Sequence, residues 1–369
     1  MSIPFVDLAA QYESIKTEIA EKISEVLETR AFIQGKYADE FAQSFLRIHG
    51  GSFGAGCSNG TSAITVALRA LGIGQGDEVV TANNTFFATI EGICETGATP
   101  VLVDSLSGSH GMDPVSLKAA LTNQTKAVMP VHLYGNPCRM DEISAIAREH
   151  ELEIVEDCAQ AHLAAYEGQP VGTFGGAATF SFYPGKNLGA YGDAGFVICR
   201  DAEVERLVKM HADHGRRDKY QHEIVAGNFR IDGMQAAILS VKVKYLKEWT
   251  ALRIQNADIY DGLLKPKGFR VIERTGGEGS CSVYHLYVVE VSNRDAVQKH
   301  LNKAKISSGI HYPVPMSRQP ALADLGYSKG RLPVSERAAT RILSLPMFPE
   351  LAGDQIEEIV STFLEVAEP

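Results

Sequence analysis

Between about Gly54 and Arg200 the chain alternates short, β-rich apolar runs with longer runs of helical periodicity. Continuous apolar segments such as AVMPVHL at 127–133, separated by helical segments, are typical of parallel strands that are buried on both faces of a sheet. The alternation therefore predicts an α/β fold in which helices cover both faces of a mainly parallel sheet.

The predicted strands are short runs rich in β-branched and other apolar residues, at Glu78–Ala82, Pro100–Asp104, Ala127–His132, Glu153–Asp157, Ala178–Tyr183 and Gly195–Arg200. The predicted helices between them include Ser62–Leu71, Ala88–Thr96, Pro114–Leu121 and Met140–His150.

Beyond this region the pattern changes to that of a smaller α/β unit. Its expected elements are a long helix from Gly233 to Leu263, a strand within 284–291, a helix at Arg294–Lys303, a strand at Ser307–His311 and a last helix at Gly353–Val366. We expect a large domain over residues 1–250, which begins with an N-terminal arm and helix, and a small C-terminal domain over residues 251–369.

Composition narrows the function classes. The chain has 369 residues, 45% of them hydrophobic, which suffices for a large core, and its formal net charge is -10. A net acidic chain is a poor general binder of nucleic acid or of anionic membranes, so we expect neither as a partner. The N-terminal sequence lacks the basic start and apolar run of a signal peptide, and no apolar stretch approaches the ~18 residues of a membrane span. Six scattered cysteines, with no Cys-x-x-Cys pair, indicate neither disulfides nor a metal site and favour a reducing cytoplasm.

The segment FSFYPGKNLGAYGDAG at 180–195 presents Lys186 from a Pro-Gly turn that follows a predicted strand. A lysine in such a glycine-rich loop is well placed to enter a cleft. An uncharged lysine amine there could form a Schiff base with an aldehyde. The alternative is a solvated loop lysine.

The segment IVEDCAQAH at 154–162 ends a predicted strand on Asp157. Ligands bind at the carboxyl ends of strands in open α/β sheets. A carboxylate there could pair with the pyridine nitrogen of pyridoxal phosphate (PLP), whose ring then serves as an electron sink. Gln160 could reach the cofactor from the same turn. The alternative for Asp157 is a cap for a following helix.

Two further segments could complete a cofactor site. Small polar residues, with Gly60 and Thr61 among them, open the helical run at 57–71, and such an N-terminus could bind a phosphate together with the Ser181 hydroxyl. Phe86, in TANNTFFATIE, could stack on a flat cofactor ring. The alternative for the phosphate site is an ordinary helix cap, and the alternative for Phe86 is an aromatic residue of the core.

Taken together, these segments resemble the DegT family of nucleotide-sugar aminotransferases, which has the aspartate-aminotransferase fold (fold type I). The resemblance runs from PFVDLAAQY at 4–12 to HYPVP at 311–315 and LSLPMFP at 343–349. It implies pyridoxal 5'-phosphate as cofactor, with Lys186 as Schiff-base lysine and proton shuttle and Asp157 as partner of the pyridinium. The other cofactor contacts that the resemblance implies are Gln160 to the ring hydroxyl, Phe86 to the ring face, and Gly60, Thr61 and Ser181 to the phosphate.

The resemblance also implies a homodimer with shared active sites. In GNFRIDGMQAAIL at 227–239, Asn228 matches an asparagine that reaches the phosphate of the neighbouring subunit's cofactor. The residues expected near the sugar nucleotide are Tyr183, Arg230, His311 and Tyr312. The resemblance also implies that the loop HGRRDKYQH at 214–222 lies near the sugar nucleotide. The alternative for this loop is a solvated charge run, and the alternative for HYPVP is a plain strand end.

The expected reaction transfers an amino group from L-glutamate, which leaves as 2-oxoglutarate, to a nucleotide-linked keto sugar, for amino-sugar biosynthesis that includes glycan, lipopolysaccharide or antibiotic pathways. Many relatives have histidine where this chain has Tyr183, and the FYPGKN version resembles the subgroup that acts at the third carbon. A dTDP-linked 3-keto-6-deoxyhexose is the preferred substrate, and a UDP-linked 3-keto uronic acid is the alternative.

Three rival functions remain. A sugar dehydratase of this fold has histidine in place of the lysine, which Lys186 argues against. A non-catalytic regulatory or sensing protein would not need the set formed by Lys186, Asp157 and Ser181. A Rossmann dehydrogenase would need a glycine fingerprint between a strand and a helix, whereas GIGQGDEVV at 72–80 follows a helical run and precedes a strand.

Overall fold

The structure, a computed structural model, describes residues 2–328 and 330–369. Its centre is a seven-stranded sheet in the order β1-β9-β8-β5-β4-β2-β3. In that order the strands are Phe53–Cys57, Gly195–Cys199, Ala177–Ser181, Glu153–Asp157, Thr125–Met129, Glu78–Ala82 and Thr99–Val103. Only β9 runs antiparallel to its neighbours, so the prediction of a mainly parallel sheet is confirmed.

Helices cover both faces of this sheet because successive side chains of each strand point to opposite faces. One face packs against α3 and α7, through residues such as Val155 and Val197. On the other face, Phe180 and Ile198 pack against α2 and α8, and Val128 packs against α5 and α6. The helices of this layer and of the adjoining loops are α2 (Lys36–His49), α3 (Gly60–Ala70), α4 (Phe87–Cys94), α5 (Pro114–Ala120), α6 (Met140–Glu149), α7 (Ala202–Ala212) and α8 (Gly233–Lys242).

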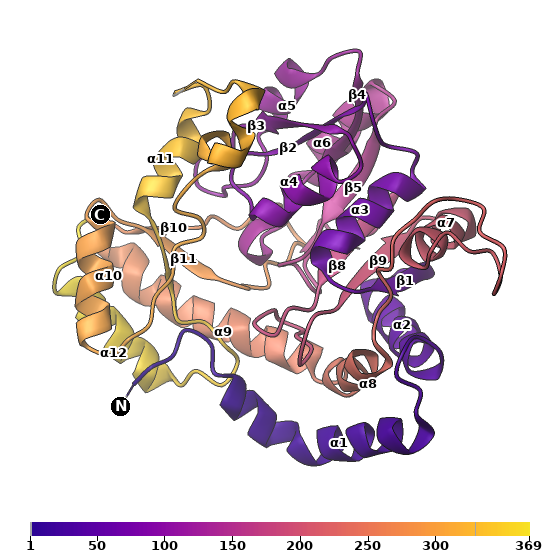
Figure 1. Cartoon of the computed structure of the whole chain (residues 1–369). Coiled ribbons are helices and arrows are strands. Elements are labelled where there is room, and N and C mark those ends of the chain that lie inside the picture. Colours follow the sequence, from indigo (N-terminus) through magenta and orange to yellow (C-terminus); the bar gives the residue numbers. More distant parts are fainter. Residues whose placement is uncertain (1, 329) are drawn as a thin grey trace.

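A second sheet of three antiparallel strands, in the order β10-β11-β12, lies beside the first (Figure 1). Its strands are Arg270–Val271, Tyr287–Glu290 and Ile342–Leu345, and the helices near it are α9 (Leu246–Leu264), α10 (Arg294–Lys303), α11 (Pro333–Arg341) and α12 (Gly353–Leu364). The minor elements are the β6–β7 hairpin (Ala165–Tyr166, Gln169–Pro170) and the 3-10 turns Leu133–Gly135, Lys265–Lys267, Met316–Arg318 and Pro320–Leu325.

The expected N-terminal arm and helix are present. Ile3 pairs with Ile306 beside the second sheet, and α1 (Leu8–Thr29) then runs along one side of the molecule under α8 (Figure 1). Among the helices of the described residues, none combines the length with the apolar composition that a membrane-spanning segment needs.

Three structural predictions are wrong. The continuous helix over 233–263 is two helices, because the chain makes tight turns at 243–245 in which Tyr245 N–H bonds to the Lys242 carbonyl. The strand at Ser307–His311 is a single bridge between Gly309 and Ser344. The strand expected to reach His132 ends at Met129, since Pro130 has no N–H to donate to a neighbouring strand.

Candidate active site

The carboxyl ends of β5, β8 and β2 meet at one edge of the large sheet, where the predicted site residues gather. Asp157 is the last residue of β5, Ser181 ends β8, and Phe86 is the N-cap of α4, the helix that follows β2. This is the edge at which ligands bind in open α/β sheets.

Lys186 stands in the turn after β8, where its N–H bonds to the Tyr183 carbonyl at 2.8 Å. Burial lowers the pKa of the Lys186 amine to about 8, although the nearby charge of Asp157 acts in the opposite direction. The structure leaves Lys186 only partly exposed, and a shielded amine of this kind differs from the fully solvated lysine of the alternative. A larger fraction of this amine is uncharged near neutral pH, as Schiff-base formation requires.

Asp157 is buried and holds two hydrogen bonds. Its Oδ1 accepts from Ala159 N–H at 3.1 Å, and its Oδ2 accepts from the Thr89 hydroxyl at 2.9 Å. The Thr89 hydroxyl lies 2.7 Å from that of Thr85, which extends the polar chain. The segment after Asp157 is a series of turns, so the alternative that Asp157 caps a helix is wrong.

Gln160 links two elements around the same site. Its Oε1 accepts from Tyr134 N–H at 2.6 Å, and its Nε2 donates to the Tyr312 hydroxyl at 3.2 Å. The ring of Tyr312 lies 5.5 Å from that of Phe86 between centroids. Phe86 is 54% exposed, so it is not the core aromatic of the alternative.

The start of α3 forms a close-fitting cradle beside Ser181. Asn59 caps the helix by accepting from Ser62 N–H, which leaves the N–H groups of Gly60 and Thr61 at the helix end. A Cβ atom on Gly60 would lie 2.7 Å from the Ser181 Cβ, so only glycine permits this approach. Backbone N–H groups beside a hydroxyl are the donors that a phosphate needs. The residues present therefore fit a flat, phosphorylated cofactor.

His311 and Tyr312 approach this site from the second sheet. The Nδ1 of His311 lies 2.9 Å from the Ser344 hydroxyl, and its carbonyl accepts from the Tyr134 hydroxyl at 2.5 Å. Burial, followed by the charge of Lys186, lowers the pKa of His311 to about 4. The ring is therefore neutral at physiological pH.

The segment with Asn228 and Arg230 pairs with the chain just before α3, through a bridge between Arg230 and Cys57. Asn228 is exposed, and Arg230 donates to Asp213 at 3.1 Å. Tyr183 precedes Lys186 in the turn and is 62% exposed.

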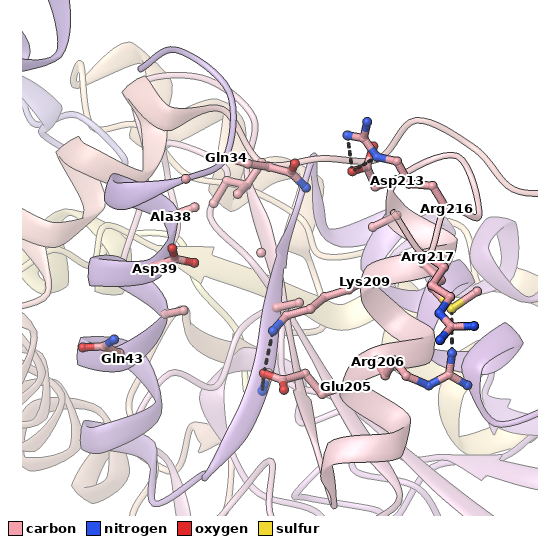
Figure 2. A pocket seen from close by; sticks show the side chains of 18 of the residues that line it. Gln34, Ala38, Asp39, Gln43, Glu205, Arg206, Lys209, Asp213, Arg216 and Arg217 are labelled. Carbon is pink, nitrogen blue, oxygen red and sulfur yellow. Dashed lines mark hydrogen bonds and ion pairs between the residues drawn. The ribbon is translucent and has the colours of Figure 1, made fainter. Parts of the chain in front are cut away.

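A groove of ≈ 1220 Å³ between α2 and α7 is separate from the candidate site. Figure 2 shows its charged lining, in which basic and acidic side chains face one another. Lys209 pairs with Glu205 at 3.2 Å and Arg216 with Asp213 at 2.5 Å, so its basic groups are largely neutralised.

A buried cluster of His132, Glu156 and Cys158 has the side-chain types of a metal site. However, Cys138 N–H donates to His132 Nδ1 at 3.0 Å, so the ring proton sits on Nε2, which donates to Glu156 at 3.1 Å. A metal ion would need the Nε2 lone pair that this proton occupies. The cluster is therefore a hydrogen-bonded support for the end of β5.

Replacing Glu156 with glutamine should lower the free energy of unfolding by about 2–4 kcal/mol. The carboxylate accepts from Gly172 N–H at 2.7 Å and Phe174 N–H at 2.8 Å in addition to His132, and the glutamine NH₂ would face at least one of these donors. Urea denaturation measures the change. The surface variant Glu142→Gln should leave the midpoint nearly unchanged, and equal midpoints for both variants would contradict the proposed support.

Sequence reasoning missed Thr89 and Tyr134. Thr89 lies within the segment TANNTFFATIE, but nothing in that segment distinguishes its hydroxyl from the neighbouring polar groups. Tyr134 has φ 63° in the turn after β4, and this conformation aims its N–H at Gln160. Both contacts join residues that are far apart in the sequence.

Known proteins resemble this chain over nearly its full length. A pleiotropic regulatory protein of Geobacillus stearothermophilus is 43% identical, over 99% of this chain and 98% of its own. A UDP-N-acetyl-3-dehydro-alpha-D-glucosamine 3-aminotransferase of Acidithiobacillus ferrooxidans is 40% identical (98% and 96%). A dTDP-3-amino-3,4,6-trideoxy-alpha-D-glucose transaminase of Streptomyces venezuelae is 38% identical (99% and 96%).

The crystal structure of DesV from S. venezuelae matches with a TM-score of 0.95 at 37% identity, over 99% of this chain and 98% of that one. Its agreement with the present structure confirms the predicted aminotransferase fold. The model of the DegT/DnrJ/EryC1/StrS aminotransferase family matches residues 13–364. The chain therefore belongs to the DegT/DnrJ/EryC1/StrS aminotransferase family.

Proposed function

We propose that this protein is a pyridoxal 5'-phosphate-dependent aminotransferase that moves an amino group from L-glutamate to a nucleotide-linked keto sugar. The observation that carries the proposal is the partly buried Lys186, whose pKa is lowered to about 8, next to the buried carboxylate of Asp157. A pair of this kind suits a carbonyl cofactor that contains a pyridine nitrogen.

Bound PLP would supply an electron sink that stabilises the negative charge left when a proton leaves the substrate carbon. Lys186 would hold the cofactor and carry that proton. Asp157 would keep the pyridine nitrogen protonated, with Thr89 fixing the orientation of its carboxylate. Gly60 and Ser181, with the neighbouring Thr61, would hold the phosphate. Phe86 would cover the ring and Gln160 would contact its hydroxyl.

The proposed sugar substrate carries its keto group at the third carbon. Relatives with 38–40% identity are named as 3-amino-sugar enzymes, one for a dTDP sugar and one for a UDP sugar. We prefer a dTDP-linked 3-keto-6-deoxyhexose and keep a UDP-linked 3-keto sugar, such as a uronic acid, as the alternative. Tyr183, His311, Tyr312 and Arg230 are the proposed sugar-nucleotide contacts.

A regulatory role is the second candidate, because the relative with 43% identity is named a pleiotropic regulatory protein. The two roles are separated by an assay of the purified protein with PLP, glutamate and a panel of nucleotide-linked keto sugars. Formation of 2-oxoglutarate with at least one sugar supports the enzyme. Its absence across a panel that includes dTDP- and UDP-linked 3-keto sugars would favour the regulator.

The proposal extends to the setting of the enzyme. A division near residue 250 would separate a large PLP-binding domain from a small one that carries the second sheet. All six cysteines are free thiols, which suits a reducing cytoplasm. The product would enter amino-sugar biosynthesis, for example of lipopolysaccharide, other glycans or an antibiotic.

We further propose a two-fold homodimer in which Asn228 serves the neighbouring subunit's site. Asn228 is exposed, and its backbone pairs with Asp213, so the segment is held in place without contacting its own Lys186. A two-fold axis would place each such segment beside the other subunit's cofactor.

Mixing Lys186→Ala subunits with Asn228→Ala subunits should therefore restore activity that neither parent has. In a mixed dimer one site would carry both substitutions and the other neither. Transamination is measured after subunit exchange has been verified with differently tagged chains. Continued inactivity despite exchange would place Asn228 outside the shared site.

A further inference from the structure

The segment at 281–286, which leads into β11, crosses the large-sheet edge and reaches the loop that carries Lys186. Val283 N–H donates to the Gly135 carbonyl at 2.9 Å. The amide Nδ2 of Asn187, the residue that follows Lys186, donates to the Val283 carbonyl at 3.0 Å. The buried amide of Asn187 thus joins the base of Lys186 to the second sheet.

The oxygen atom of the Asn187 amide faces the ring of His285. This Oδ1 lies 3.3 Å from His285 Nδ1. The Val283 carbonyl can only accept, which fixes Nδ2 on that side of the amide and leaves Oδ1 facing the ring. His285 Nδ1 must then carry the proton and donate, and a neutral ring keeps its lone pair on Nε2.

The surroundings of His285 favour a neutral ring on a constrained backbone. Burial lowers the pKa of His285 well below its ordinary value, and the charges of Lys186 and Arg253 lower it further, as do His311 and His162. Arg253 Nη1 bonds to the carbonyls of Tyr284 and His285 at 3.1 and 3.5 Å, which holds the main chain from α9.

The turn at Gly135, which packs against the backbone of His285, is also constrained. Gly135 has φ 88°, and a Cβ atom there would lie 3.0 Å from His285 N. Only glycine permits both this conformation and this approach. The backbone that carries His285 is therefore held from two sides, by Arg253 and by the turn at Gly135.

We propose that His285 is a positioning residue that acts through Asn187 on Lys186. Its Nδ1–H fixes the Asn187 amide, and the amide fixes the backbone from which the Lys186 side chain extends. The contact also ties the second sheet to the Schiff-base lysine. Since the ring is neutral, it adds no positive charge beside the amine. The inference rests on the proposed function of Lys186.

Two substitutions separate the roles of the two ring nitrogens. The amide nitrogen of asparagine stands as many bonds from Cα as Nδ1, and that of glutamine as many as Nε2. His285→Asn should therefore preserve the contact with Asn187, whereas His285→Gln and His285→Phe should lose it. Asn187→Ala removes the other partner. Asn256→Ala is the matched control, because this buried asparagine on α9 donates to the Phe348 carbonyl, away from Lys186.

The first readout needs neither cofactor nor activity. The pH dependence of Lys186 acylation, followed by peptide mass spectrometry in the cofactor-free protein, reports the pKa of the amine. Loss of the contact should loosen the loop and admit water, so the midpoint should rise from about 8 in His285→Phe, His285→Gln and Asn187→Ala. The midpoint of the acylation profile should stay unchanged in His285→Asn and in the Asn256→Ala control.

The second readout is kinetic. In the loop-loosening variants kcat should fall about tenfold with KM for the sugar nucleotide nearly unchanged, less than the ~100-fold that a 1 Å misplacement can cost. Should His285→Phe fail to fold, the asparagine and glutamine variants still decide the matter. Wild-type behaviour of His285→Gln and Asn187→Ala, or recovery by glutamine and not by asparagine, would overturn the inference. The proposed function would survive that result, provided that the wild-type protein transaminates.

Discussion

Replacement of Lys186 by alanine should abolish both transamination and covalent attachment of PLP. Loss of a positioned proton-transfer group alone costs up to ~10⁴-fold, and loss of the covalent link adds to this. Borohydride reduction of the loaded wild-type protein should leave a pyridoxyl label on the peptide that contains Lys186. The label should be absent from Lys186→Ala and from Lys186→Arg, whose guanidinium stays charged.

Lys242 provides a matched comparison. Burial lowers its pKa to about 8 as well, but it lies over the ring of Tyr191, and Glu350 is the charge that acts on it. A lowered pKa is therefore insufficient for the chemistry, and the neighbourhood of Asp157 distinguishes Lys186. A label on Lys242, or none on either lysine after PLP loading, would refute the assignment.

The lowered pKa also predicts the pH dependence of loading. An amine with a pKa of about 8 is about one-tenth uncharged at pH 7 and mostly uncharged above pH 8.5. The rate at which the cofactor-free protein takes up PLP should therefore rise about tenfold per pH unit below 7 and level off above 8. Absorbance of the bound cofactor follows this rate. A profile that still rises steeply between pH 9 and 10 would indicate an ordinary lysine.

The parallel strands of the core could be predicted because the apolar pattern that marks each strand lies within that strand. Strands buried on both faces are continuous apolar runs between helices, and the bounds expected for β2 and β5 agree with the structure. The edge strand β1, which reads FGAGC, has two glycines and little β-propensity, so its pairing with β9 depends on tertiary contacts. The break at 243–245 was missed because the helical periodicity continues across it.

The same difference between local patterns and long-range contacts applies to the candidate site. Asp157 and Lys186 could be predicted because each ends a strand or follows one, and the sheet then brings the two strand ends together. The bond from Thr89 to Asp157 spans 68 residues, and the contact between His285 and Asn187 spans 98. Such contacts have no periodicity in the sequence and emerge only when the chain is folded. In 284–291 the sequence showed only a strand, although that segment carries His285.

Asp157→Asn should fold and bind PLP but transaminate at least ~100-fold more slowly. The local hydrogen bonds tolerate the amide, since its oxygen can still accept from Ala159 N–H. Its NH₂ group can donate to Thr89, whose hydroxyl can turn to donate to Thr85 at 2.7 Å. Only the negative charge is lost.

The negative charge of Asp157 is the property that would keep the cofactor's pyridine nitrogen protonated. A pyridine nitrogen without an anionic partner gives up its proton, and the ring then withdraws electrons less strongly from the substrate carbon. Loss of an electrostatic partner in a shielded site costs ~3 kcal/mol, which is more than 100-fold in rate. The Thr89→Val variant, which keeps the charge and loses the hydrogen bonds of the Thr89 hydroxyl to Asp157 and Thr85, should be impaired far less. Cofactor content from absorbance and kcat from 2-oxoglutarate formation separate binding from chemistry. Near-normal turnover of Asp157→Asn at full cofactor occupancy would mean that the Asp157 carboxylate only closes the turn at Ala159.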